Sequence, residues 1–197
     1  MNTEEMHKKG CLFVPSFLDK QTTMTISSYI QNKAKRASFV PEGIDRTNSN
    51  YYWYADPLLE ILLDNNTSTV EKISGKSLYP TYSYTRIYSE KDMLQKHVDR
   101  DECQYSVSVH IAKTGNDSPF YIENYFGETE EHILSPGDAI VYIGNKCLHW
   151  RKPLAQTNTL LNTQVMLHYV DKHGDHSELR FDGREELGLS KAKLNWI

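Results

Sequence analysis

Three residues of this chain have the types and spacing of metal ligands. His97 and Asp99 are two positions apart, and residues two apart in an extended strand point to the same face. One imidazole nitrogen and one carboxylate oxygen can therefore converge on a single point. His149, later in the chain, would add a second imidazole. Two histidines and one carboxylate leave the opposite positions of a metal open, an arrangement typical of non-heme Fe(II) sites.

The His-x-Asp pattern is too short to identify a site by itself. A second match, His173-Gly174-Asp175, falls in a polar turn with no histidine at a useful distance after it, and we expect it to be solvent-exposed. The His97 match differs in its surroundings. It follows an aromatic strand that ends at Tyr88, and the turn Pro136-Gly137-Asp138 and an apolar strand come before His149.

Composition predicts a cytoplasmic, globular protein. The 197 residues suffice for a single domain over 1–197, and 39% hydrophobic residues can form a core. The net charge of -4 gives no reason to expect nucleic-acid binding, and no apolar run approaches the length of a membrane span. The acidic start, Met1 to Glu5, lacks the features of a secretory signal.

Cysteine usage agrees with a reducing compartment. The chain has three cysteines, an odd number without CxxC spacing, which argues against a disulfide framework and against a cysteine-rich zinc site. We expect Cys147, two residues before His149, to be a small buried hydrophobe. Nothing in the sequence indicates the oligomeric state.

Helical signals occupy the first part of the chain, about 15–75. Asp19 is a candidate N-cap for a helix to about Ala34, and Asp56-Pro57 is a strong start for another. A further helical piece around Thr67 to Ser74 would end at Gly75. Between these helices, the polar segment from Arg36 to Tyr51 is long enough to be a substrate-facing loop or a lid.

From Leu78 the hydrophobic period changes from helical to two, which predicts a jelly-roll core over about 78–181. Along the first strand, Tyr82, Tyr84, Arg86 and Tyr88 share one face. About eight short strands follow from the turn signals, with a short last one at Glu178 to Phe181. Helices followed by strands of this kind predict a mainly β fold, a double-stranded β-helix (jelly roll) with flanking helices packed on one sheet.

At these positions the sequence resembles the 2-oxoglutarate- and Fe(II)-dependent dioxygenases of the prolyl-4-hydroxylase-like type. The resemblance spans roughly residues 11 to 170. It is moderately specific as a set of motifs and weak in any single one. The matching stretches are Phe13 to Leu18 before a helix, Arg86-Ile87-Tyr88 leading to His97-Val98-Asp99, Pro136 to Tyr142, and His149.

The resemblance implies an enzyme, a hydroxylase in which His97, Asp99 and His149 bind Fe(II). Its cosubstrate would be 2-oxoglutarate, which chelates the iron and is converted to succinate and CO2, with ascorbate as a candidate reductant. The prime substrate would be a small molecule or a peptide, including peptidyl proline.

The distal carboxylate of 2-oxoglutarate needs a cation or strong donors, because burying it unpaired is costly. The family usually places Arg or Lys shortly after the second histidine, but Gln156 to Leu160 offers neither. Arg151 is the best local substitute, since it would share a strand face with His149. Arg86 is second, and the hydroxyl of Tyr84 could assist it. For either arginine alone, a surface ion pair is about as plausible a role.

Two alternatives use the same barrel. A cupin-like metalloprotein without 2-oxoglutarate would suit Pro136-Gly137 and His149, but its first motif requires His-x-His where this chain has Asp99. The other alternative is a non-catalytic binding module. The intact set of three ligands argues against a decayed site.

Overall fold

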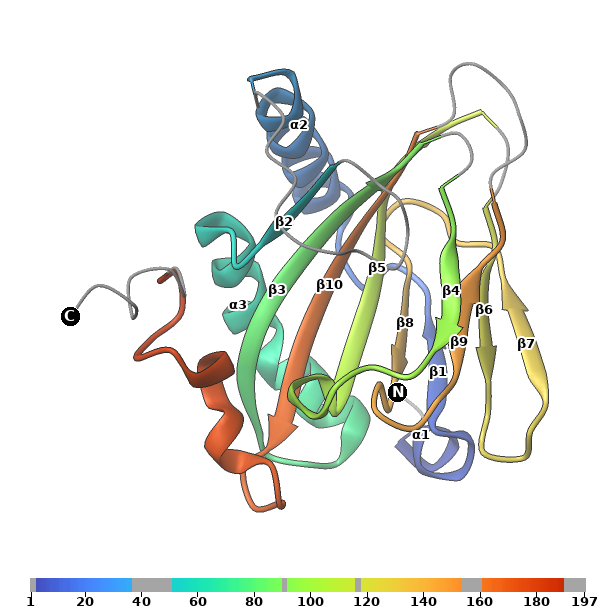
Figure 1. Cartoon of the computed structure of the whole chain (residues 1–197), viewed down its shortest axis with the longest axis vertical. Helices are drawn as coiled ribbons and strands as arrows, with labels where there is room; N and C mark the ends of the chain where they lie inside the picture. Colours follow the sequence, from blue (N-terminus) through green and yellow to red (C-terminus); the bar gives the residue numbers. More distant parts are fainter. Residues whose placement is uncertain (1–2, 37–50, 90–91, 116–117, 154–160, 190–197) are drawn as a thin grey trace.

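The computed structural model describes residues 3–36, 51–89, 92–115, 118–153 and 161–189 (Figure 1). Two antiparallel sheets face each other, one of six strands and one of four. The six-stranded sheet is the major sheet, and the four-stranded one is the minor sheet. Their arrangement confirms the predicted jelly roll.

The order of the strands in each sheet brings distant parts of the sequence together. In the major sheet the order is β1 (Cys11–Val14), β8 (Ala139–Tyr142), β5 (Tyr105–Thr114), β10 (Leu161–Asp171), β3 (Leu78–Tyr88) and β2 (Tyr51–Tyr54). In the minor sheet it is β4 (Leu94–His97), β9 (His149–Arg151), β6 (Phe120–Glu123) and β7 (Thr129–His132).

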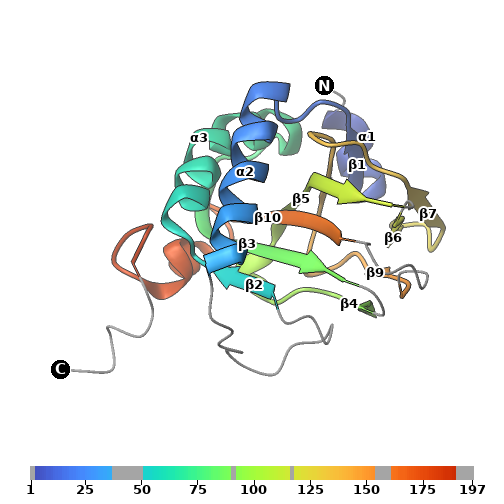
Figure 2. The same cartoon turned by 90° about the horizontal axis from the view of Figure 1, so that it is seen from above.

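Helices cover the outer face of the major sheet, as predicted. The long ones are α2 (Lys20–Arg36) and α3 (Pro57–Ser74), and a short α1 (Thr3–Lys9) precedes β1 (Figure 2). On β5, Val107 and Val109 belong to the core beneath these helices. The intervening Ser106 and Ser108 point the other way, into the space between the sheets, because side chains alternate along a strand.

The limits of α3 follow from its end residues. Asp56 accepts hydrogen bonds from the backbone N–H groups of Leu58 (3.0 Å) and Leu59 (3.3 Å). Gly75 adopts a φ of 67°, the left-handed conformation that suits a glycine after a helix. Both predicted caps are confirmed. The two helical pieces expected here form one continuous helix.

Some expectations were incomplete or wrong. The predicted short strand Glu178 to Phe181 is instead part of η2, a 3-10 segment spanning Ser177–Gly183, in which Phe181 and Asp182 have φ values of 55° and 56°. Positive φ is incompatible with an extended strand. Neither α1 nor the edge strand β2 was predicted. The expected loop or lid lies at 37–50, outside the described residues.

A buried ion pair between Arg184 and Glu60 connects the C-terminal segment to β3 of the major sheet. The guanidinium of Arg184 donates to Glu60 through Nη1 (2.9 Å) and Nη2 (2.8 Å), and also to the backbone oxygen of Thr81. Glu60 in turn accepts from the backbone N–H of Ser83. Since Thr81 and Ser83 flank Tyr82 on β3, this pair fixes the strand from behind.

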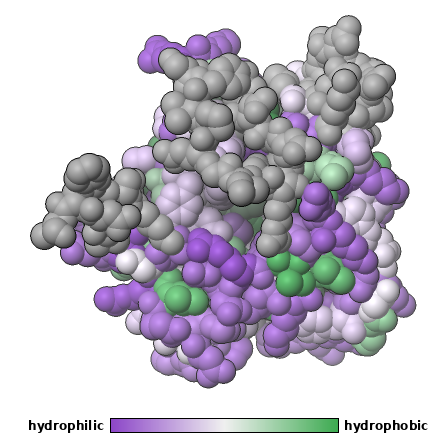
Figure 3. Space-filling model, viewed as in Figure 1, coloured by the Kyte–Doolittle hydropathy of each residue, from purple (hydrophilic) through white to green (hydrophobic). Residues whose placement is uncertain are grey.

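The described surface seen in Figure 3 is mainly hydrophilic, and apolar side chains appear on it in small separate patches. No helix in the described ranges is long and apolar enough to cross a membrane. All three cysteines are buried and free.

Candidate functional site

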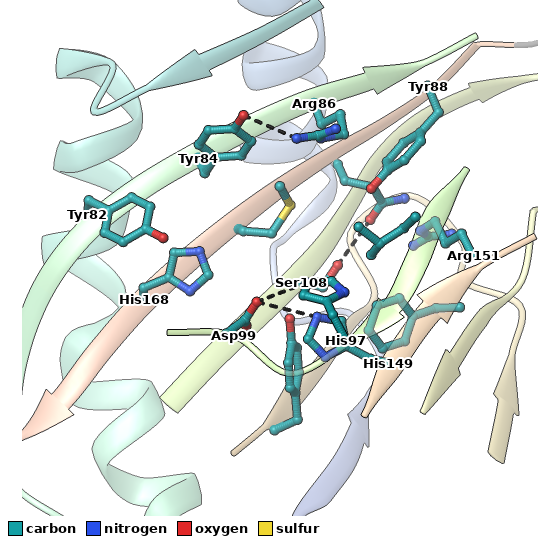
Figure 4. Close-up of a pocket in the computed structure, with 15 residues that line it drawn as sticks. Tyr82, Tyr84, Arg86, Tyr88, His97, Asp99, Ser108, His149, Arg151 and His168 are labelled. Carbon is teal, nitrogen blue, oxygen red and sulfur yellow. Dashed lines mark hydrogen bonds and ion pairs between the residues drawn. The ribbon is translucent and has the colours of Figure 1, made fainter. Parts of the chain in front are cut away.

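His97 and His149 are brought together by the pairing of two strands of the minor sheet. His97 is the last residue of β4 and lies directly opposite His149, the first residue of β9. Their rings are 4.4 Å apart between centroids. Figure 4 shows His97, Asp99 and His149 pointing toward one another, with Arg86 and Tyr84 toward the opposite side of the view.

Asp99 lies beside the two histidines, but it is not on the strand on which the sequence analysis placed it. It was expected to share a strand with His97, but β4 ends at His97, and Asp99 lies in the loop before η1 (Asp101–Cys103). Its backbone N–H donates to the carbonyl of Gly144 (2.8 Å). A Cβ on Gly144 would come within 2.7 Å of the Asp99 carboxylate and 2.2 Å of the Cys103 carbonyl, so only glycine fits there.

The two histidines present the same nitrogen to Asp99. Nδ1 of His97 lies 2.7 Å from the carbonyl of Gln95, and Nδ1 of His149 lies 3.0 Å from the carbonyl of Cys147. A carbonyl only accepts hydrogen bonds, so both Nδ1 atoms carry protons and both Nε2 atoms are left for another partner. This is how a backbone carbonyl typically orients a metal-binding imidazole.

These Nε2 atoms converge on one carboxylate oxygen. Oδ1 of Asp99 is 3.4 Å from Nε2 of His97 and 3.5 Å from Nε2 of His149. Burial raises the pKa of the Asp99 carboxyl, but hydrogen bonds from His149 and His97, when each ring carries a second proton on Nε2, outweigh burial and hold the pKa well below its usual range. The three atoms fit a divalent cation placed among them. Nitrogen and oxygen donors without thiolate suit iron or a similar metal.

The second carboxylate oxygen of Asp99, Oδ2, contacts a serine of β5, and that serine contacts a histidine of β10. Ser106 Oγ is 3.2 Å from Oδ2 of Asp99 and 2.9 Å from Nδ1 of His168. Burial lowers the pKa of His168 to about 4, so its ring is neutral at pH 7. With the proton on Nδ1, His168 donates to Ser106, whose hydroxyl proton then has two acceptors, the Asp99 carboxylate and the carbonyl of Cys103 at 3.1 Å. The sequence signal for Ser106 was its place on the polar face of an alternating strand.

A second cluster shares Asp99 but is less suited to a metal. Asp99, Cys103 and His168 also have ligand atoms within 4.8 Å of one another. Burial raises the pKa of the Cys103 thiol well above its ordinary value, so the sulfur is protonated, and it lies 3.0 Å from the hydroxyl of Tyr82. His168 is already hydrogen-bonded through Ser106.

A cavity of about 210 Å³ extends from the candidate metal ligands between the two sheets. Its wall includes the three sequence-predicted anchor residues, Arg151, Arg86 and Tyr84. The structure therefore brings all six predicted site residues to one space. The remaining wall residues are Tyr82, Tyr88, Leu94, Ser108, Phe120, Tyr142, Gln164, Met166 and His168.

Arg151 is a buried cation held by neutral groups. Its side chain is 3% exposed, and Nη1 donates to the carbonyl of Ser118 (2.7 Å). When the amide oxygen of Gln164 faces it, that oxygen lies 3.3 Å from Nη2 and 2.7 Å from Nδ1 of His110. Burial lowers the pKa of Arg151, and no described carboxylate pairs with it. A surface ion pair is thus excluded for Arg151. Gln164 was not predicted.

Arg86 lies on the neighbouring wall, among tyrosine rings. Its side chain is 5% exposed, and Nη2 donates to the hydroxyl of Tyr84 (3.1 Å). Its guanidinium carbon is 5.3 Å from the centroid of the Tyr84 ring and 5.7 Å from that of Tyr88. Arg86 is therefore a cavity residue and does not lie on the surface.

No family model and no curated protein matches the sequence. Solved structures do match its fold. A prolyl-4-hydroxylase from Pseudomonas putida matches with a TM-score of 0.67 at 10% identity, over 84% of this chain and 95% of that one. A prolyl hydroxylase from Trichoplax adhaerens, in complex with a hypoxia inducible factor peptide fragment, has a TM-score of 0.71 at 10% identity, over 87% and 88%.

The epimerase SnoN from nogalamycin biosynthesis, solved with Fe3+, alpha ketoglutarate and nogalamycin RO, matches with a TM-score of 0.69 at 12% identity, over 95% of this chain and 91% of that one. The matches cover nearly the whole length of these proteins. They establish that the chain has the double-stranded β-helix fold of 2-oxoglutarate- and Fe(II)-dependent oxygenases.

Replacing Ser106 by alanine should weaken metal binding, because the carboxylate of Asp99 would lose its hydroxyl partner. We expect the affinity for Fe(II), measured by anaerobic titration without 2-oxoglutarate, to fall on the order of tenfold or more. Ser108→Ala is the matched control, since Ser108 lies on the same face of β5 and contacts Gln164 instead. Equal Fe(II) affinity in the two variants would contradict a supporting role for Ser106.

Proposed function

We propose that the protein is an Fe(II)- and 2-oxoglutarate-dependent hydroxylase. In the overall reaction a substrate C–H bond becomes C–OH with one oxygen atom of O2. The second oxygen atom enters 2-oxoglutarate as it loses CO2 and forms succinate. His97, Asp99 and His149 would hold the iron, and the iron would supply the activation of O2 when bound. The protein would contribute ligand geometry, substrate placement and exclusion of water.

One observation carries the proposal: a converging set of metal ligands shares one small cavity with a buried guanidinium, that of Arg151, which pairs with no carboxylate among the residues that the structure describes. A buried cation is costly unless an anion compensates it. A ligand that places one carboxylate near the metal and another on Arg151 satisfies both ends of this cavity. The volume of about 210 Å³ lies below the ~300–1,000 Å³ of pockets for drug-sized ligands. It therefore suits a small dicarboxylate.

We assign the distal carboxylate of 2-oxoglutarate to Arg151 in preference to Arg86. Arg151 follows His149 on the same face of β9, so the cation and the metal ligand are placed by one strand. Ser118 and Gln164 hold two of its nitrogens and thereby orient the guanidinium before a ligand binds. A preoriented fork can bind a carboxylate through two parallel hydrogen bonds.

The cupin-like alternative explains less of the cavity. It accounts for His97, Asp99 and His149, but it gives no reason to bury Arg151 beside them. The proposal leaves the prime substrate open between a small molecule and a peptide. One structural neighbour is a prolyl hydroxylase solved with a peptide fragment, which supports a peptide as one candidate class of substrate. A cytoplasmic location, with ascorbate as reductant, remains part of the proposal.

An anaerobic titration tests whether metal and cosubstrate bind together. Adding 2-oxoglutarate to the Fe(II)-loaded protein should produce a visible charge-transfer absorption that neither component gives alone. His97→Ala should abolish the absorption, because the variant loses a proposed ligand. His173→Ala, which alters the exposed second His-x-Asp match, should retain it. If iron binds but 2-oxoglutarate leaves the spectrum unchanged, the cosubstrate assignment fails and the cupin-like alternative is favoured.

Arg151→Gln should weaken 2-oxoglutarate binding without affecting the metal. Losing a charge-assisted hydrogen bond to the carboxylate should raise the 2-oxoglutarate dissociation constant on the order of 10- to 100-fold. The Fe(II) dissociation constant should change little. Titrating the charge-transfer band gives both values, and Arg151→Lys should restore part of the affinity. Wild-type 2-oxoglutarate affinity in Arg151→Gln would show that another residue is the anchor.

A further inference from the structure

A buried histidine lies behind the cavity wall next to Arg151. His110 on β5 is directly opposite Gln164 on β10 in the strand pairing, so the two side chains point to the same face of the major sheet. They are 2% and 1% exposed. Gln164 lines the cavity and contacts Arg151, whereas His110 is not among the described residues that line it. His110 therefore contacts the cavity wall from behind, through Gln164.

The position of the proton on His110 follows from its surroundings. Nδ1 lies 2.7 Å from the side-chain amide of Gln164, whereas Nε2 is buried and has no hydrogen-bond partner among the described residues. A proton on Nε2 would leave a buried donor without an acceptor, which is costly. Burial lowers the pKa of His110 to about 4, so the ring carries a single proton at pH 7. That proton belongs on Nδ1.

The tautomer of His110 decides which end of the Gln164 amide faces Arg151. An N–H on Nδ1 requires an acceptor, so the amide oxygen of Gln164 faces His110. In this orientation the oxygen is 3.3 Å from Nη2 of Arg151, and the amide nitrogen donates to the carbonyl of Val109 (3.1 Å). The opposite tautomer would turn the amide nitrogen toward the guanidinium, which is itself a donor. The Asn162 amide, 2.6 Å away, can donate to the same oxygen through its nitrogen.

We propose that His110 is a positioning residue for the cosubstrate. Its Nδ1–H holds the Gln164 amide so that the oxygen accepts from Arg151, and this fixes the guanidinium for the distal carboxylate of 2-oxoglutarate. The inference rests on the proposed function, in which Arg151 binds that carboxylate. Because His110 and Gln164 are both neutral, they orient the guanidinium without compensating its charge. A carboxylate in the place of Gln164 would compete with the cosubstrate for Arg151.

Anaerobic titration of the Fe(II)-loaded protein with 2-oxoglutarate tests this role. His110→Phe keeps a buried ring but removes the N–H, and the dissociation constant for 2-oxoglutarate should rise about 5- to 10-fold. His110→Asn places an amide N–H near the position of Nδ1 and should restore much of the affinity. Gln164→Glu should raise the dissociation constant on the order of tenfold or more, because its carboxylate pairs with Arg151.

A cycle of single and double variants separates positioning from a structural effect. Because His110 acts through Gln164, His110→Phe should add little to the loss of 2-oxoglutarate affinity in Gln164→Leu, and the two effects should not multiply. The Fe(II) dissociation constant should stay near that of the wild type in each variant. His132→Phe, the same exchange at a half-buried histidine of β7 that does not line the cavity, should behave as the wild type.

The position of the proton can also be measured in the unaltered protein. With diamagnetic Zn(II) bound and the histidines labelled with 15N, two-bond 1H–15N correlation spectra should show His110 protonated at Nδ1. If the wild type does not bind 2-oxoglutarate with the metal, the proposed function fails and this inference fails with it.

Four other outcomes overturn the inference alone, with the proposed function intact. They are a proton on Nε2 of His110, wild-type 2-oxoglutarate affinity in His110→Phe, an equal loss of Fe(II) affinity in that variant, and effects that multiply in the double variant.

Discussion

The site depends on one constraint: the carboxylate of Asp99 faces two imidazole nitrogens whose partner nitrogens are both committed to backbone carbonyls. The rings cannot turn away without losing those hydrogen bonds. The carboxylate cannot withdraw either, because its backbone is bonded to Gly144 and its second oxygen contacts Ser106. Three donor atoms are therefore held in place in advance, and a cation among them is the simplest group that satisfies all three.

The space between the sheets divides into two parts of different chemistry. Around Cys11, Phe120, Ile140 and Cys147 it is filled by apolar side chains and serves as a core. Toward β3 and β10 it is lined by histidine, tyrosine and arginine and remains open as the cavity. The helices pack on the outside of the major sheet, so the main hydrophobic core lies behind the cavity. Because that core stabilises the fold, polar residues can occupy the space inside the barrel.

Much of the fold and of the candidate site could be predicted from local sequence signals, and the exceptions have physical causes. The caps of α3 and the alternation on β3 could be predicted because each depends on neighbouring residues. Asp99 lies beside His97 and His149 as expected, but not for the expected reason, since β4 ends at His97 and a loop supplies the carboxylate. The support from Gly144, Ser106 and Gln164 comes from other strands and turns, and such long-range contacts leave no local pattern.

We propose that a metal ion binds among His97, Asp99 and His149. Anomalous diffraction at the iron edge, from crystals grown anaerobically with Fe(II), tests it most directly. We predict a single peak within bonding distance of Nε2 of His97, Nε2 of His149 and Oδ1 of Asp99. A peak among Asp99, Cys103 and His168 instead, or no peak at either cluster, would contradict it.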